Sequence, residues 1–127
     1  MTADVNGKLE AMMAHIQEEP GAGQRVKTAG GLEAVVCHLG PPDLKSIKPA
    51  TLDDITDLLS SSADGVRAAA AATLGCIGAP AARALPMLRL ARDHLQRDRN
   101  SGKGPKSKSF AAMEAAIAKI ADPAQRP

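Results

Sequence analysis

Aromatic residues are almost absent from this chain. Its 127 residues include no Trp, no Tyr and one Phe, although 44% of them are hydrophobic. Apolar burial must therefore come from Ala, Leu, Ile, Val and Met, a set that suits helices better than strands, which favour β-branched and aromatic residues. The same scarcity removes the platforms on which proteins stack the bases of single-stranded nucleic acid. We predict an all-α domain that is large enough to bury one core.

Cysteines and long apolar runs are scarce as well. Cys37 and Cys76 are far apart, and neither a Cys-x-x-Cys pair nor a histidine cluster accompanies them. This pattern argues against a zinc site and a disulfide framework, so we expect two separate thiols on helices. The N-terminus lacks a basic segment followed by an apolar core, and no apolar run reaches membrane length. We therefore expect a cytoplasmic protein with no membrane contact.

The net charge of +2 is small, but the charges are unevenly distributed. Residues 1–66 carry five Lys and Arg against ten Asp and Glu, a net charge of −5. Residues 67–127 carry eleven against four, a net charge of +7. An acidic half next to a basic half favours either a charged partner or head-to-tail self-association.

Apolar residues recur at helical spacing in six segments, 5–16, 32–39, 51–59, 64–77, 79–98 and 109–121. Thr51, Asp64 and Ser109 are the expected N-caps, and Gly78 is an expected C-terminal stop. Pro86 falls inside the fifth segment. It predicts either a kink or a short turn followed by a helix that has Pro86 in its first turn.

The linker between helices is repeated. The sequence LGPPDLKSI at residues 39–47 matches IGAPAARAL at residues 77–85 with an offset of 38. A third copy, IADPAQR at residues 120–126, follows at an offset of 43. Self-similarity at this period is typical of stacked helical repeats. We therefore predict three antiparallel helical hairpins, approximately 1–40, 41–78 and 79–122, within a single domain of residues 1–127.

The segment DGVRAAAAATLGCIGAPAARALPMLRLARDHL resembles the HEAT-repeat family, in particular its compact, Ala-rich variety known from phycobilisome lyases. The residues that match the family pattern are Asp64, Val66, Arg67, Ala68 to Ala72, Leu74, Gly75, Ile77, Gly78, Pro86 and Leu88. The resemblance implies a short α-solenoid of three stacked hairpins. The alanines then let neighbouring helices approach closely, because small side chains shorten the distance between helix axes.

A basic segment precedes the last predicted helix. It contains Arg97, Arg99, Lys103, Lys106 and Lys108, against Asp98 alone. The GKG at residues 102–104 lacks the Gly, the Ser or Thr and the strand of a phosphate-binding loop, so nucleotide binding is not expected. The basic side chains remain candidates for contact with an acidic protein surface or with nucleic acid phosphates, and a merely solvated loop is the alternative.

Nothing in the local sequence indicates catalysis. His15, His38 and His94 belong to different predicted helices, and none has a nucleophile at local spacing. Asp53, Asp54 and Asp57 gather near a helix N-terminus, where negative charge complements the helix dipole. We therefore expect no catalytic residues, no metal and no cofactor.

Two classes of function follow from these features. The resemblance implies a non-enzymatic protein-binding adaptor, in which the second helices of the hairpins (about 31–39, 65–77 and 109–121) line a shallow concave surface. Its partner is another protein, for which an acidic surface fits, and a homodimer is a further option if the terminal hairpins leave a face uncovered. The alternative is nucleic-acid binding through the basic C-terminal half. By analogy alone, an accessory subunit or an inhibitor of an enzyme is a third option.

Overall fold

The computed structural model describes residues 5–18, 21–61, 63–100 and 108–121. Every regular element in these ranges is a helix, and no strand occurs among them, so the all-α prediction is confirmed. Seven are α-helices and two, η1 and η2, are 3-10 helices. In chain order they are α1 (Val5–Glu18), α2 (Ala22–Cys37), α3 (Pro41–Lys45), α4 (Pro49–Asp57), η1 (Leu58–Ser60), α5 (Asp64–Ile77), η2 (Ala79–Ala84), α6 (Leu85–Asn100) and α7 (Lys108–Ala121).

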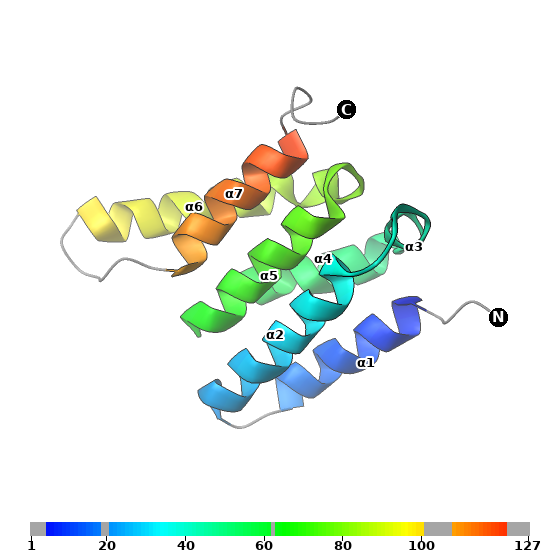
Figure 1. Ribbon diagram of the computed structural model, residues 1–127. Coiled ribbons are helices and arrows are strands. Elements are labelled where there is room, and N and C mark those ends of the chain that lie inside the picture. The colour runs from blue at the N-terminus through cyan, green and yellow to red at the C-terminus, as the bar shows by residue number, and fades with distance from the viewer. Residues whose placement is uncertain (1–4, 19–20, 62, 101–107, 122–127) are drawn as a thin grey trace.

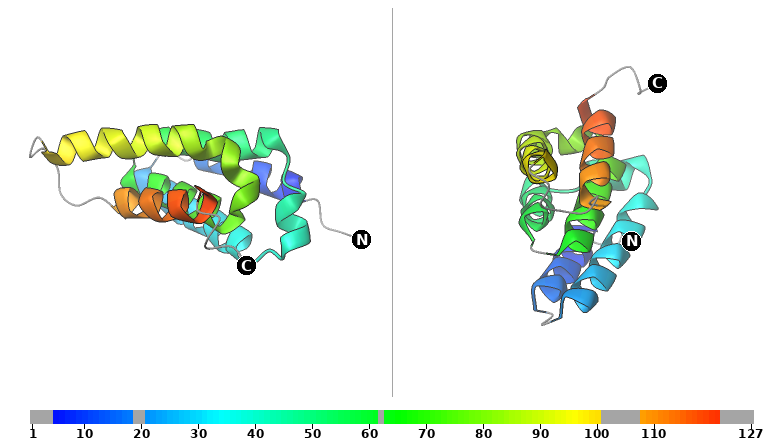
Figure 2. Two further views of the ribbon diagram at one scale, coloured as in Figure 1. Left: turned by 90° about the horizontal axis from the view of Figure 1, so that it is seen from above. Right: turned by 90° about the vertical axis from the view of Figure 1, so that its left-hand side faces the viewer.

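The long helices form two layers. α2, α5 and α7 lie side by side in one layer, and α1, α4 and α6 lie behind them (Figure 1). Figure 2 shows the same two layers from two further directions. The most extensive contacts join α5 to α7 and α5 to α2, while α1 packs on α2 and α6 packs on α7. α5 is therefore the central helix of its layer.

Small residues let α5 approach both of its neighbours. A Cβ atom placed on Gly65 would lie 2.6 Å from Cγ1 of Val26 on α2. A Cβ atom on Gly75 would lie 3.3 Å from the Cα atom of Ala116 on α7. Ala71, between these two glycines, is completely buried. These contacts agree with the expectation that the alanine run serves close helix packing.

The core consists mainly of aliphatic side chains that the sequence places on the inner helix faces. In α5 the apolar residues that recur at helical spacing, Val66, Ala70, Leu74 and Ile77, are all buried. The largest fully buried apolar side chains are Leu9, Ile16, Leu32, Val36, Ile55, Val66, Leu74, Leu88 and Met113. They come from α1, α2, α4, α5, α6 and α7, so one continuous core joins the two layers.

The two repeated linkers occupy corresponding places. Residues 41–45 form α3 between α2 and α4, and residues 79–84 form η2 between α5 and α6. Gly78 precedes η2 with φ +74°, a value that glycine adopts at low cost and other residues adopt rarely. α6 begins at Leu85, so Pro86 lies in the first turn. The alternative without a kink, a short turn followed by a helix, is the correct one.

Two helix starts differ from the sequence prediction. α4 begins at Pro49 rather than after a Thr51 cap, because Pro49 suits the first turn and Thr51 is buried, with an exposed fraction of 2%. α2 begins at Ala22, ten residues before the predicted helix, and continues through Gly23, Gly30 and Gly31. Packing against α1 and α5 explains the longer helix, since tertiary contacts override the low helix propensity of glycine.

The expectation of two separate thiols is wrong. Cys37 and Cys76 form a disulfide, with their Cα atoms 5.2 Å apart and a separation of 39 positions in sequence. Cys37 ends α2 and Cys76 lies in the last turn of α5, and these two helices are neighbours. The bridge therefore joins the C-terminal ends of two adjacent helices. The wide separation in sequence had argued against pairing, but residues about one repeat period apart come into contact when the two helices pack side by side.

Candidate functional site

A largely apolar cleft of about 470 Å³ lies where η1, α5, α6 and α7 meet. Its lining consists of Leu59, Ser60, Ser61, Arg67, Met87, Leu90, Ala91, His94, Leu95 and Met113. Six of these are Leu, Met or Ala side chains, and the polar ones are concentrated at Ser60, Ser61, Arg67 and His94. A pocket with apolar walls and a few polar groups is typical of a binding site for a largely apolar ligand or side chain.

Arg67 is held rigidly in the wall of this cleft. Its Nη1 donates to the carbonyl oxygen of Ser61 at 2.7 Å, and its Nη2 donates to Oδ1 of Asp64 at 3.1 Å. Its Nε lies 3.4 Å from Oγ of Ser109 on α7. With its nitrogens engaged and an exposed side-chain fraction of 20%, the Arg67 guanidinium is a fixed polar group in the cleft wall, and Asp64 balances its charge.

Asp64 links α5 to α7 instead of capping its own helix. The N-cap residue of α5 is Ala63, and it makes no side-chain capping bond. The carboxylate of Asp64 accepts the Ser109 hydroxyl at 2.7 Å and the backbone N–H of Lys108 at 3.1 Å. It thereby satisfies a free N–H group in the first turn of α7. The prediction that Asp64 and Ser109 are N-caps is therefore wrong, because each lies inside its helix.

Leu90 is the most conspicuous apolar side chain at the edge of the cleft. It is 52% exposed, the larger of two such exposures among the large hydrophobic residues described. It belongs to α6, which extends past the start of α7 in Figure 1. Leu85, Leu88, Ala91 and Leu95 recur at helical spacing on one face of α6, and Leu90 lies off that face. An apolar residue outside the buried face of a helix is the sequence feature that could have indicated an exposed binding surface here.

The basic candidate residues are only partly placed. Arg97 and Arg99 belong to the last turns of α6, where the structure describes the backbone alone. Lys103 and Lys106 lie outside the described residues. Lys108 begins α7 and is exposed. Contact of this basic segment with a partner therefore stays a prediction.

The residues that match the repeat pattern serve packing and helix termination. Val66 and Gly75 are buried, Gly78 follows the end of α5, and Pro86 lies in the first turn of α6. Arg67 differs from these positions because it also lines the cleft. It is the one member of this set that combines a structural network with a surface available to a ligand.

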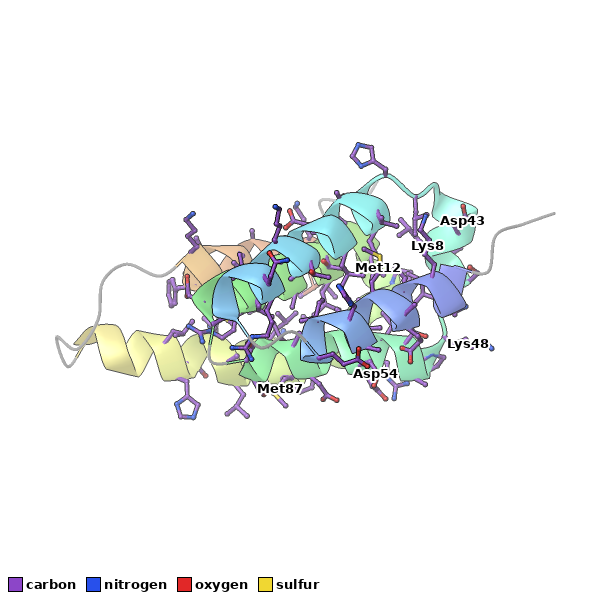
Figure 3. All side chains as sticks on the ribbon, turned by 90° about the horizontal axis from the view of Figure 1, so that it is seen from below. Lys8, Met12, Asp43, Lys48, Asp54 and Met87 are labelled. Carbon is purple, nitrogen blue, oxygen red and sulfur yellow. A yellow bond between two sulfur atoms is a disulfide. The ribbon has the colours of Figure 1, made fainter. Side chains whose placement is uncertain are left out.

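The three aspartates of the LDDITD segment separate in space. Asp53 accepts two hydrogen bonds from Arg83 of η2, at 2.8 and 3.1 Å. Asp54 points toward α1 (Figure 3), and a hydrogen bond with its carboxyl raises the pKa of Glu10, with burial and charge repulsion as smaller causes. Asp57 lines a different crevice, near Arg25. The three carboxylates therefore do not form one acidic site.

In the described part of the chain, no group of three or more His, Cys, Asp and Glu side chains is arranged to hold a metal ion. Nδ1 of His38 lies 2.6 Å from the carbonyl oxygen of Ala34, and His94 is exposed at the cleft. None of the described helices is long and apolar enough to cross a membrane.

Comparison with known proteins adds no relative. No family model, no curated protein and no solved structure matches the chain. The likeness to HEAT repeats therefore stays a prediction from the sequence. The cytoplasmic location is also untested, and the disulfide weighs against it, because such bonds persist mainly in oxidising compartments.

Proposed function

We propose that this chain is a non-enzymatic adaptor, a short α-solenoid of three stacked helical hairpins that binds another protein. The hairpins are α1 with α2, α4 with α5, and α6 with α7. The two-layer arrangement, the central place of α5 and the matching linkers α3 and η2 support this interpretation. About three units are needed before stacked hairpins bury a continuous core, and the chain reaches that number.

The cleft beside Leu90 is the observation that carries the binding role. Burying the exposed half of Leu90 against a partner is favourable by roughly 1 kcal/mol, and Met87, Ala91 and Leu95 extend the apolar surface around it. The occupant we propose is an amphipathic helix of another protein, with apolar side chains in the cleft and acidic side chains around its rim.

Charge supports an acidic occupant. Arg67 lines the cleft and Arg92 lies on α6, but each is already paired with a carboxylate, Asp64 and Asp93 respectively, so the attraction comes from the surplus of positive charge in this half of the chain. Residues 67–127 carry a net charge of +7. Opposite charge on the partner would accelerate association and exclude basic competitors. Nucleic-acid binding shares this electrostatic argument, but the apolar lining of the cleft offers nothing specific to phosphates.

A photo-crosslinking amino acid at position 90 tests this proposal in cells of the source organism. We expect it to capture one predominant protein through a segment that alternates apolar and acidic residues. The same probe at Lys27, an exposed position on α2 far along the stack, is the matched control and should not capture that protein. The Leu90→Asp substitution should abolish copurification, because it places a charge in the apolar cleft.

Other captures would contradict the proposed occupant. Crosslinks to a second copy of the chain would make the cleft a self-association surface. Crosslinks to nucleic acid would favour the alternative function of the basic half. Equal capture of the same protein from positions 90 and 27 would show that the cleft is not the specific site.

A further inference from the structure

A second crevice, of about 220 Å³, lies between α1, α2, η1 and α5. Its residues are Ile16, Arg25, Asp57, Leu58, Ser60, Ser61 and Val66. Ser60 and Ser61 also border the larger cleft, but Arg25 and the side chains of α1 and α2 do not. The crevice is therefore a separate feature with its own charged group.

Arg25 is unusual among the arginines of this chain. Its Nε is buried and has no hydrogen-bond partner within the described residues. Buried polar groups are nearly always hydrogen-bonded, and a buried donor without a partner is costly. By contrast, Arg67, Arg83 and Arg92 all donate to neighbouring oxygens. The residues of the described structure leave this donor unsatisfied, and the crevice provides the space through which an external acceptor can approach the guanidinium group of Arg25.

The nearest anionic group of the crevice does not fill this role. Asp57 is exposed and lines the same crevice, yet no ion pair joins it to Arg25 in the described structure. Further donors are present at Ser60 and Ser61. Oγ of Ser61 accepts the N–H of Ala63 at 3.2 Å, which leaves the hydroxyl hydrogen free to donate.

The walls favour a ligand with a short carbon chain. Ile16, Leu58 and Val66 are buried side chains with exposed fractions of 2%, 6% and 1%. A guanidinium fork matches the planar geometry of a carboxylate, and two parallel N–H···O bonds are the strongest arrangement available to it. The negative charge of Asp57 disfavours a doubly charged phosphate more than a singly charged carboxylate.

We propose that the Arg25 crevice binds a carboxylate group carried on a short aliphatic chain. Arg25 forms the ion pair, the serine hydroxyls donate to the same oxygens, and the aliphatic walls contact the carbon chain. This chemistry has two sources, a free short-chain monocarboxylate or the glutamate side chain of a bound peptide. The proposal is independent of the adaptor function and of the Leu90 cleft.

Nuclear magnetic resonance provides a direct test on the full chain. The Nε–Hε signal of Arg25, assigned from its loss in Arg25→Lys, is followed during titration with butyrate and with a blocked peptide that contains one glutamate. We expect a saturable shift with at least one of the two. Butyramide and the matching glutamine peptide, which have the same shape without charge, should produce no saturable shift.

The two titrations distinguish a free carboxylate from a glutamate side chain as the natural ligand. Saturation by butyrate alone assigns a free monocarboxylate, and saturation by the glutamate peptide alone or more tightly assigns a protein side chain. Arg25→Lys keeps the charge but loses the fork, and we expect it to weaken binding by about tenfold. Arg89→Lys is the matched control on exposed α6 and should leave binding unchanged.

Two outcomes would overturn the proposal. The first is the absence of a saturable shift of the Arg25 signal with both butyrate and the peptide. The second is equal weakening in Arg25→Lys and Arg89→Lys, which would indicate nonspecific attraction. The thermal midpoint of each variant shows that it is folded. Asp57→Asn should tighten binding, since it removes a competing negative charge.

Discussion

Val26 and Ala116 lie on two different helices, and each contacts a glycine of α5. At the residue scale, the distances between α5 and its two neighbouring helices therefore depend on glycines, which have no side chain. Gly65 leaves room for the branched side chain of Val26, and Gly75 leaves room for the backbone of α7. Larger residues at either place would separate the helices or force neighbouring side chains out of their preferred rotamers.

Substitution of Gly75 by Leu should lower the free energy of unfolding by about 1–3 kcal/mol, because the new side chain meets Ala116 and Lys119 of α7. The midpoint and slope of urea unfolding measure this change. Ala118→Leu introduces the same leucine side chain at an exposed position of α7 and should change stability by less than about 0.5 kcal/mol. Equal stability of both variants would argue against close packing at Gly75.

The sequence anticipated the buried positions better than the caps. The 3.6-residue period alone identified the inner face of α5, since burial follows the stripe of Val66, Ala70, Leu74 and Ile77. The partners of Asp64 could not be predicted in this way. Its carboxylate bonds to Lys108 and Ser109, more than forty residues away, and only the packing of α5 on α7 brings them within reach.

At the scale of whole elements, the disulfide is the feature that connects α2 to α5 independently of packing. The bridge joins the exposed Cys37 to the partly buried Cys76 at the same end of both helices. The sequence did contain a relevant signal, because the spacing of the cysteines, 39 residues, is close to the repeat offset of 38. Corresponding positions in adjacent repeats lie close together, so this coincidence favours pairing.

Reduction of the disulfide should lower the free energy of unfolding by about 2–4 kcal/mol, because it releases a long loop in the unfolded chain. Urea unfolding with and without a phosphine reductant measures the effect. The double variant Cys37→Ser/Cys76→Ser should be as unstable as the reduced protein, whether or not the reductant is present. Two freely alkylated thiols in the untreated protein, or identical unfolding curves with and without reductant, would contradict the bridge.

At the scale of the whole molecule, the linker repeat was the strongest predictor of architecture. The match of residues 39–47 with residues 77–85 agrees with the corresponding places of α3 and η2 between long helices, while the three-hairpin solenoid stays a proposal. The Leu90 cleft and the Arg25 crevice could not be foreseen, because each collects residues from at least four segments of the chain. Helical periodicity identifies which residues are buried, but it does not show which exposed side chains meet.

The central place of α5 between α2 and α7 underlies both the proposed solenoid and the cleft. Nuclear Overhauser effects between methyl groups and glycine α-protons measure it most directly, in a protein labelled with ¹³C and ¹⁵N. A central α5 predicts contacts of Gly65 with the Val26 methyls and of Gly75 with the Ala116 methyl in the same sample. If either contact is missing while both glycines are assigned and ordered, α5 does not lie between these helices and the stack is wrong.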